Sequence, residues 1–219
     1  KWAGRESAGG NRISVNPKSL NDKTLQVIGR RHSVNDFYNA YELVRKSRIP
    51  VVNVDLIIGL PQETEQEIAY SLEQAVKLAP ENLTVHTLTL KRSAPLFQKQ
   101  EQAVLTTQAA EKMVQRAAEM AAAIGLEPYY LYRQHYMLGH LANIGYAKPG
   151  TESIYNIQMM EERHPVIGVG PASASKVPLP DGHHLHKLNM PKNVAVYGAR
   201  LQELAERRRD LFNIEGTDL

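Results

Sequence analysis

The stretch from Val51 to Ile58 constrains this chain most, because it is a nearly continuous apolar run with a single ionisable side chain, Asp55. Pro50 precedes the run and Gly59-Leu60-Pro61 ends it, so residues that break regular structure stand at both ends. Such a run is typical of a parallel β-strand covered on both faces. A lone charge in an apolar strand is costly unless it is partnered, so we expect Asp55 to meet a ligand or an internal ion pair.

Strand and helix patterns alternate around this run, and the alternation predicts a parallel α/β sheet. Right-handed crossovers in such a sheet place the strand ends, and a ligand site with them, on one edge. Capping residues predict where three helices begin. The expected strands are 12–16, 51–58 and 82–90; the expected helix starts are Asn21-Asp22, Ser33 with Asp36, and Thr64 with Glu67; a long helix is expected from Glu101 to Ile124, ended by Gly125.

The sequence pattern changes after Gly125, where short segments are separated by Gly and Pro. Extended segments are expected at 129–134, 154–160 and 166–169, and Asp181-Gly182 is a hairpin-turn signal. Pro191 suits the first turn of one final helix. We therefore expect two domains, an α/β part over residues 1–125 and a small α+β domain over residues 126–219.

Composition narrows the functional classes. The 219 residues contain no cysteine, which excludes disulfides and cysteine-ligated metal within this chain. A net charge of +3 without a basic stripe gives no reason to expect nucleic acid. No apolar run reaches the roughly 18 residues of a membrane span, and no signal-peptide pattern opens the chain. The chain begins at Lys1 rather than Met, which indicates part of a longer protein.

Two further motifs have structural explanations. The run Gly168-Val169-Gly170-Pro171 lacks the third glycine of a nucleotide fingerprint, and proline removes a backbone donor. Its small residues indicate instead a close approach of the backbone to a ligand or to a neighbouring strand. His183, His184 and His186 follow the turn signal and are expected to lie on an exposed hairpin, so no metal site is predicted.

Several motifs taken together resemble the oxygen-independent coproporphyrinogen III oxidases, a family of radical S-adenosylmethionine enzymes. They stand in the family's order over about residues 11 to 212, and the segment 130–134 is similar to a branch of coproporphyrinogen dehydrogenases within it. The motifs are Arg12-Ile13-Ser14-Val15-Asn16-Pro17, Gly29-Arg30-Arg31-His32, Asn53 to Pro61, Gly145-Tyr146-Ala147-Lys148-Pro149-Gly150, and Gly168-Val169-Gly170-Pro171-Ala172.

The resemblance implies the C-terminal part of a (β/α)6 partial TIM-like barrel, followed by the family's small C-terminal domain. It implies S-adenosylmethionine as cofactor, together with a [4Fe–4S] cluster that cleaves it to a 5′-deoxyadenosyl radical. The radical abstracts hydrogen from a propionate of coproporphyrinogen III, which loses carbon dioxide to become a vinyl group. The cluster-binding cysteines are absent from this chain. The implied partners are therefore the porphyrin and a missing N-terminal part of the same protein, and the chain alone is expected to be inactive.

The resemblance also implies cofactor-binding residues. Arg30 and Asp55 match the family residues that contact S-adenosylmethionine, Lys18 stands where the family usually shows Gln, and Gly59 ends the strand. A sulfonium cation with an amino-acid carboxylate calls for both anionic and cationic partners. We therefore expect Asp55 and Arg30 to share a pocket, although Asp55 in an internal ion pair and Arg30 at a helix end also have structural explanations.

Substrate residues follow from the same resemblance. Arg133 is expected to meet a porphyrinogen propionate, because a guanidinium fork suits a carboxylate, with Tyr132 beside it. Ala142 and Ser153 depart from the acidic residue and the cysteine that relatives often carry. No catalytic residue is singled out. The alternatives are a haem- or porphyrin-binding relative without decarboxylase activity, and an unrelated α/β scaffold.

Overall fold

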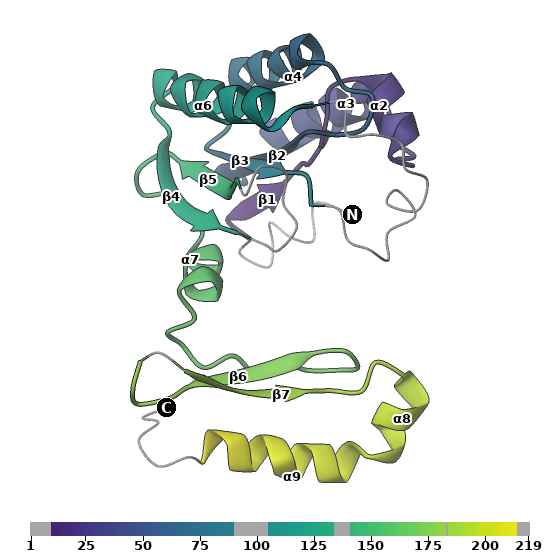
Figure 1. Cartoon of the computed structure of the whole chain (residues 1–219), viewed down its shortest axis with the longest axis vertical. Helices are drawn as coiled ribbons and strands as arrows, with labels where there is room; N and C mark the ends of the chain where they lie inside the picture. Colours follow the sequence, from purple (N-terminus) through teal and green to yellow (C-terminus); the bar gives the residue numbers. More distant parts are fainter. Residues whose placement is uncertain (1–9, 90–104, 134–140, 183, 214–219) are drawn as a thin grey trace. The chain divides into compact units, whose positions relative to one another are not determined.

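The computed structural model describes residues 10–89, 105–133, 141–182 and 184–213 (Figure 1). The chain divides into two compact units, Lys1–Ser153 and Ile154–Leu219. Within the described ranges, no helix is long and apolar enough to cross a membrane.

The first unit is built on a five-stranded sheet with strand order β1-β2-β3-β5-β4. Strands β1, β2 and β3 are parallel, whereas β5 is antiparallel to both β3 and β4. The predicted α/β fold is confirmed, and the predicted parallel pairing is confirmed for β1, β2 and β3. Its strands are β1 (Arg12–Ser14), β2 (Val51–Ile58), β3 (Asn82–Thr87), β4 (Glu127–Tyr132) and β5 (Asn143–Ala147).

The helices of this unit begin where the sequence predicts. The Asn21 side chain accepts a hydrogen bond from the Lys23 amide, and Ser33 and Thr64 each form a capping box with an acidic residue three positions on. The long helix begins after its N-cap Thr106; the predicted start at Glu101 lies outside the described residues. The helices are α2 (Asp22–Val27), α3 (Val34–Arg45), α4 (Glu65–Lys77) and α6 (Thr107–Ala123).

One face of the sheet packs on helices and the other is polar. Along β2, Val52, Val54, Leu56 and Ile58 are at most 3% exposed and join a core cluster with residues of α3, α4 and α6, which lie on this face (Figure 1). The intervening residues of β2 are only half-buried. The interpretation of β2 as a strand covered on both faces is therefore wrong for the described residues. The alternation of buried and half-buried residues was not visible in the sequence, because Val51 and Ile57 are apolar although they lie on the polar face.

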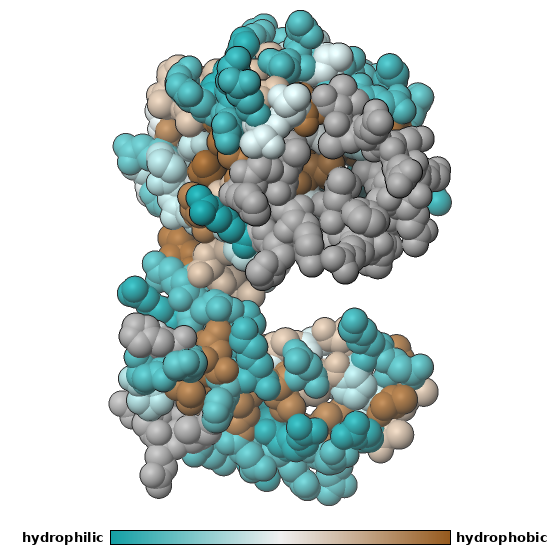
Figure 2. Space-filling model, viewed as in Figure 1, coloured by the Kyte–Doolittle hydropathy of each residue, from teal (hydrophilic) through white to brown (hydrophobic). Residues whose placement is uncertain are grey.

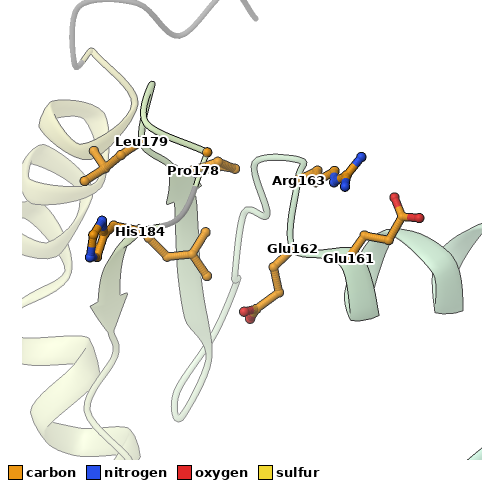
Figure 3. A pocket seen from close by; sticks show the side chains of 8 residues that line it. Glu161, Glu162, Arg163, Pro178, Leu179 and His184 are labelled. Atoms are coloured by element: carbon orange, nitrogen blue, oxygen red, sulfur yellow. The ribbon is translucent and has the colours of Figure 1, made fainter. Parts of the chain in front are cut away.

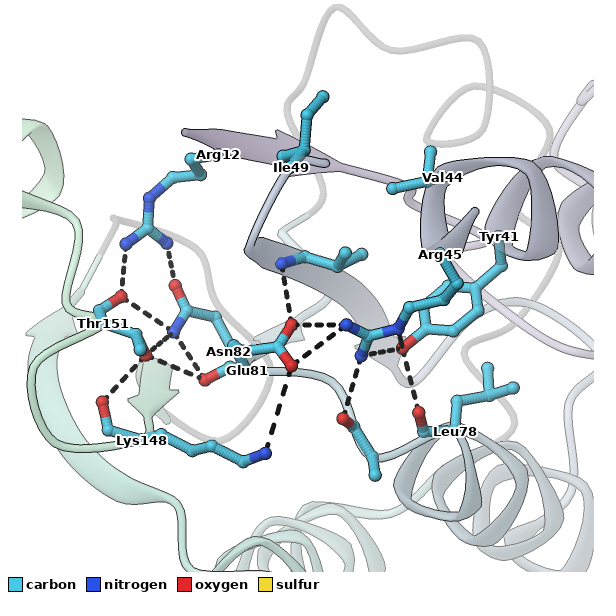
Figure 4. Close-up of polar contacts among 12 residues, drawn as sticks. Arg12, Tyr41, Val44, Arg45, Ile49, Leu78, Glu81, Asn82, Lys148 and Thr151 are labelled. Atoms are coloured by element: carbon cyan, nitrogen blue, oxygen red, sulfur yellow. Dashed lines mark hydrogen bonds and ion pairs between the residues drawn. The ribbon is translucent and has the colours of Figure 1, made fainter. Parts of the chain in front are cut away.

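Polar contacts join the strands at the edge of the sheet where β2 and β3 begin (Figure 4). Glu81 accepts hydrogen bonds from Arg45 Nη1 (2.8 Å to Oε2) and from the Val52 amide (2.9 Å). Beside it, the Arg12 guanidinium donates to Asn82 Oδ1 and to the backbone carbonyl of residue 151. These contacts connect α3, β1, β2 and β3 with the segment after β5.

The change of pattern after Gly125 corresponds to a change in strand pairing. Strands β4 and β5 form an antiparallel pair, yet both belong to the sheet of the first unit. The division into compact units falls between Ser153 and Ile154. The domain boundary at residue 125 stays a prediction about the family's domains.

The described residues of the second unit form a β-hairpin and three helices. The turn at Asp181-Gly182 joins β6 to β7, as predicted. The prediction of an extended segment at 154–160 is wrong, because these residues form a helix. They contain no Gly or Pro to interrupt a helix, and the described residues provide no neighbouring strand with which they could pair. The prediction of a single final helix is also wrong, because two helices meet at Arg200. Pro191 lies before the first of them, which begins after its N-cap Asn193 and not at the proline. The elements are α7 (Ile154–Glu161), β6 (Ala174–Pro178), β7 (Leu185–Asn189), α8 (Val194–Ala199) and α9 (Leu201–Phe212).

A small core holds the second unit together. Its buried residues come from β6, β7 and α9 and include Val177, Leu188 and Leu204. Gly168 lies directly against the backbone of Ala174, where a Cβ would overlap it, so the predicted close approach to a neighbouring strand is confirmed. Figure 2 shows hydrophobic residues among the hydrophilic ones on the visible surface of this unit. Its exposed large apolar side chains are Ile154, Tyr155, Ile167, Val169, Val194, Val196 and Leu201.

Candidate functional site

Polar side chains gather on the half-exposed face of the sheet in the first unit. Because side chains alternate along a strand, residues two apart in β2 and β3 share this face. They are Asn53 and Asp55 on β2, and Thr84 and His86 on β3. We call this set, together with Lys18 and Tyr130, the polar face.

Asp55 is the centre of the polar face. Its Oδ2 lies 3.0 Å from Lys18 Nζ and 3.6 Å from His86 Nε2, and its Oδ1 accepts a hydrogen bond of 2.7 Å from Asn53 Nδ2. Burial raises the pKa of Asp55, but His86, Lys18 and Asn53 together outweigh burial and hold the pKa well below its usual range. Asp55 is therefore an ionised carboxylate with an internal partner, one of the two outcomes that the sequence left open.

Lys18 is held toward this carboxylate by an unusual backbone. Its φ is 72°, a left-handed conformation that costs a residue with a Cβ about 1–3 kcal/mol. Both of its peptide groups bond to β2: the Lys18 amide donates to the Asp55 carbonyl (3.1 Å), and the Ile57 amide donates to the Lys18 carbonyl (2.9 Å). The Lys18 side chain is 18% exposed, and that of Asp55 is 14% exposed. The strained loop thus fixes an ammonium group next to the carboxylate.

Asn16 supplies an unused acceptor nearby. Its Oδ1 is buried and has no hydrogen-bond partner among the residues that the structure describes. Bonds from the Val15 amide to the Asn53 carbonyl and from the Lys18 amide to the Asp55 carbonyl place Asn16 alongside β2. A buried unpaired oxygen is costly, which indicates a donor supplied by something else. A carboxylate, an ammonium and a free acceptor fit S-adenosylmethionine, which carries a carboxylate, hydroxyl and ammonium donors, and a sulfonium.

The same test fails for an iron–sulfur cluster. The chain contains no cysteine, and thiolates are the ligands that such clusters require. No group of three or more His, Cys, Asp or Glu residues placed to hold a metal ion occurs among the described residues. The residues of this chain therefore do not fit a [4Fe–4S] cluster.

Gly59 and Arg30 were also predicted to bind the cofactor, and the structure places them differently with respect to Asp55. Gly59 follows β2 directly, with a φ of 88°, so it turns the backbone at the end of the strand that carries Asp55. Arg30 is exposed in the loop after α2, where its amide donates to the Leu25 carbonyl. In the described part of the chain, Arg30 forms no ion pair with Asp55. The structure thus brings Lys18 and Asp55 together and leaves the Arg30 side chain outside their cluster.

The predicted substrate residues lie at the end of β4. Tyr132 is the last residue of the strand, is 39% exposed and pairs in register with Asn143. Arg133 follows it and is exposed. Both side chains are accessible from solvent.

Sequence reasoning missed His86, Thr84 and Tyr130 as members of the polar face. One signal was available, because Asn82, Thr84 and His86 alternate with apolar residues, which indicates a strand with one polar side. The strand order of the sheet decides which strands lie beside Thr84, His86 and Tyr130. The local sequence does not encode that order.

A buried carboxyl group supports the loop that carries Lys18. Glu63 is 1% exposed and accepts a hydrogen bond from the Ser19 hydroxyl. Burial raises the pKa of Glu63 to about 7, with Ser19 and Thr24 opposing and Glu67 adding to the rise. Glu63 thus joins the loop after β1 to the turn before α4.

The second unit has an open cavity of about 540 Å³ (Figure 3). The end of α7 and the hairpin line it, with Glu161, Glu162, Arg163, Leu179 and His184 among the residues. His184 Nδ1 lies 2.7 Å from Asp181 Oδ2 at the rim, and Glu162 pairs with Lys176. His184 and Glu162 are therefore already paired with Asp181 and Lys176.

Comparisons with known proteins agree with the fold of the first unit. A family model described as the radical SAM superfamily matches residues 6–75, which include Lys18 and Asp55. A solved structure of coproporphyrinogen III oxidase (HemN) from Escherichia coli shares the fold, with a TM-score of 0.65 and 16% identity over 90% of this chain and 44% of that chain. The chain therefore carries part of a radical S-adenosylmethionine domain.

Two curated relatives narrow the class. The oxygen-independent coproporphyrinogen-III oxidase-like protein HemZ of Bacillus subtilis (strain 168) is 40% identical over 198 residues, which are 90% of this chain and 40% of that protein. The heme chaperone HemW of Escherichia coli (strain K12) is 27% identical over 82% of this chain and 44% of that protein. This chain spans less than half the length of either relative. Over nine tenths of its length this chain is thus similar to an oxygen-independent coproporphyrinogen III oxidase-like protein, as its motifs indicated, and it contains part of a radical SAM domain.

Proposed function

We propose that this chain supplies the S-adenosylmethionine-binding part of a coproporphyrinogen III oxidase-like radical enzyme. In this proposal the whole protein converts propionates of coproporphyrinogen III to vinyl groups by oxidative decarboxylation, in the cytoplasm, during haem biosynthesis. The observation that supports it is the Lys18–Asp55 pair on the polar face, in the part of the chain that matches the radical SAM superfamily.

The chemistry of the ligand supports this assignment. Asp55 offers an ionised carboxylate to the ligand's cationic groups, Lys18 an ammonium to its carboxylate, and Asn16 an unpaired oxygen to a hydroxyl or an ammonium donor. Gly59 keeps the end of β2 free of a side chain. Arg30 is included in the proposal as a cationic contact that reaches the ligand from the exposed loop.

The radical chemistry itself requires groups outside this chain. A chain without cysteine supplies no thiolate, so in the proposal the cluster ligands come from another part of the protein. The residues proposed here bind and orient the cofactor. Arg133 and Tyr132 are proposed to meet a propionate of the porphyrinogen.

Calorimetric titration with S-adenosylmethionine tests the cofactor site. Asp55→Asn keeps the shape but removes the charge, and we expect it to weaken binding by about 10-fold or more, since hydrogen bonds to charged groups contribute about 1.5–3 kcal/mol. Asp210→Asn makes the same change at an exposed position of α9 and is the matched control. Equal affinity of the wild type and Asp55→Asn would contradict the assignment.

A second candidate is a haem- or porphyrin-binding protein without decarboxylase activity. The 27% identity to a heme chaperone favours it. Anaerobic assays of the full-length protein distinguish the two candidates. Vinyl products from coproporphyrinogen III and S-adenosylmethionine support the enzyme, whereas tight haem binding without decarboxylation supports the binding protein.

A further inference from the structure

His86 is the second residue of the polar face that approaches Oδ2 of Asp55. Its Nε2 lies 3.6 Å from this oxygen, and Lys18 Nζ lies 3.0 Å from it. Lys18 belongs to the loop after β1, whereas His86 belongs to β3, the strand next to β2. The His86 side chain is 31% exposed, compared with 18% for Lys18 and 14% for Asp55. Of these three side chains, the imidazole is therefore the most accessible from the polar face.

The contact with Asp55 determines which ring nitrogen of a neutral His86 carries the proton. An ionised carboxylate only accepts hydrogen bonds, so the proton is more stable on Nε2, the nitrogen that faces Asp55. Nδ1 then holds a lone pair and is a hydrogen-bond acceptor. The carboxylate on one side of the ring thus defines the chemistry of the other nitrogen.

This second nitrogen has no partner within the described part of the chain. The contact with Asp55 is the single polar contact of the His86 side chain among those residues. Asn16 Oδ1 is the one side-chain polar atom there that is both buried and without a hydrogen-bond partner. The unpaired Nδ1 of His86 is therefore not buried, and a ligand on the polar face can reach it.

A further acceptor thus lies beside the Lys18–Asp55 pair. We propose that His86 is an additional binding residue of the S-adenosylmethionine site, and that its Nδ1 accepts a hydrogen bond from an N–H or O–H group of the ligand. The ammonium, the ribose hydroxyls and the adenine amino group are donors of this kind. With Asp55 and Asn16, His86 gives the site three acceptors, which select a cationic ligand with several donors. The inference rests on the proposed function for the identity of the ligand, but the orientation of the imidazole does not.

The first test needs no ligand. Two-bond ¹H–¹⁵N correlation NMR distinguishes the two neutral tautomers of histidine, and at about pH 8 an unperturbed imidazole is neutral. We expect the Nε2–H tautomer for His86, whose resonances are assigned by their loss in His86→Gln. His184 is the matched control, because its Nδ1 lies 2.7 Å from Asp181 Oδ2 and it should show the opposite, Nδ1–H tautomer. The Nδ1–H tautomer at His86 would overturn the proposal, since Nδ1 would then be no acceptor.

The second test separates the two ring nitrogens by calorimetric titration with S-adenosylmethionine. The side-chain amide of glutamine lies near the position of Nε2, and that of asparagine lies near Nδ1. His86→Gln keeps a donor toward Asp55 but loses the acceptor, and it should weaken binding about 3- to 10-fold, the loss expected for one hydrogen bond. His86→Asn keeps an acceptor near Nδ1 and should bind more tightly than His86→Gln. His184→Gln makes the same change at the other histidine–aspartate pair and should bind like the wild type.

The outcomes separate this inference from the proposed function. If the wild type binds S-adenosylmethionine and His86→Gln binds it equally well, the role of His86 in binding is refuted and the proposed function stands. A larger loss in His86→Asn than in His86→Gln would also refute it, because the contact with Asp55 would then be the one that matters. If the wild type binds no S-adenosylmethionine, the proposed function fails and the ligand role of His86 fails with it.

Discussion

Replacing Glu63 by Gln should remove a pH-dependent loss of stability. Glu63 is 1% exposed, and burial raises its pKa from 4.5 to about 7. Because the folded state holds this proton more tightly than the unfolded state, the free energy of unfolding falls as pH rises between these two values. A shift of about 2.5 units at about 1.4 kcal/mol each gives a loss of about 3 kcal/mol.

Urea denaturation followed by circular dichroism, at several pH values between about 5 and 8, measures this loss. The amide in Glu63→Gln stays neutral at every pH, so the variant should gain up to about 3 kcal/mol relative to the wild type over that range. Taking the difference between the two proteins cancels the histidines, which also titrate there. Asp36→Asn is the control, because hydrogen bonds from Ser33 lower the pKa of Asp36 and place its contribution at lower pH. Parallel stability curves for Glu63→Gln and the wild type would refute the reasoning.

Three further predictions follow from packing, ion pairing and composition. Gly145→Ala should displace the Tyr130 ring and destabilise the fold by about 1–3 kcal/mol, whereas Gly198→Ala in α8, where nothing lies within 4 Å, should be neutral or slightly stabilising; thermal melts compare the two. Arg45→Met should cost about 1–3 kcal/mol in chemical denaturation, because half-buried Glu81 loses its guanidinium partner and keeps only the Val52 amide and the more distant Lys148. Arg116→Met at an exposed pair should cost at most about 1 kcal/mol, and equal costs of the two variants would contradict this. Anaerobic treatment of this chain with iron and sulfide should produce no [4Fe–4S] absorption band, and a stoichiometric cluster would show that the inference from its composition is wrong.

The sequence predicted the elements whose signals are local. Asn21, Ser33 and Thr64 mark helix starts because a side-chain oxygen satisfies amides within three residues of itself. Asp55 was expected to need a partner for an equally local reason, the cost of burying a charge in an apolar strand. The structure answers that need with Lys18.

What the sequence did not predict depends on contacts between distant segments. The Tyr130 ring lies across β5 because β5 lies between β3 and β4 and carries glycine at position 145. No periodicity in β4 encodes that order. The prediction of an extended segment at 154–160 was wrong for a related reason. Its apolar residues suit a strand, but a strand needs a neighbouring strand for its backbone hydrogen bonds, whereas a helix forms these bonds within itself.

The left-handed backbone at Lys18 has a consequence for protein engineering. Glycine, or to a lesser degree asparagine, adopts this conformation more readily than lysine, so libraries selected for thermal tolerance should enrich both residues at this position. Either replacement removes the ammonium group beside Asp55. Selection for thermal stability alone would therefore remove the Lys18 side chain from the proposed site. Thermal stability and ligand binding are best screened together.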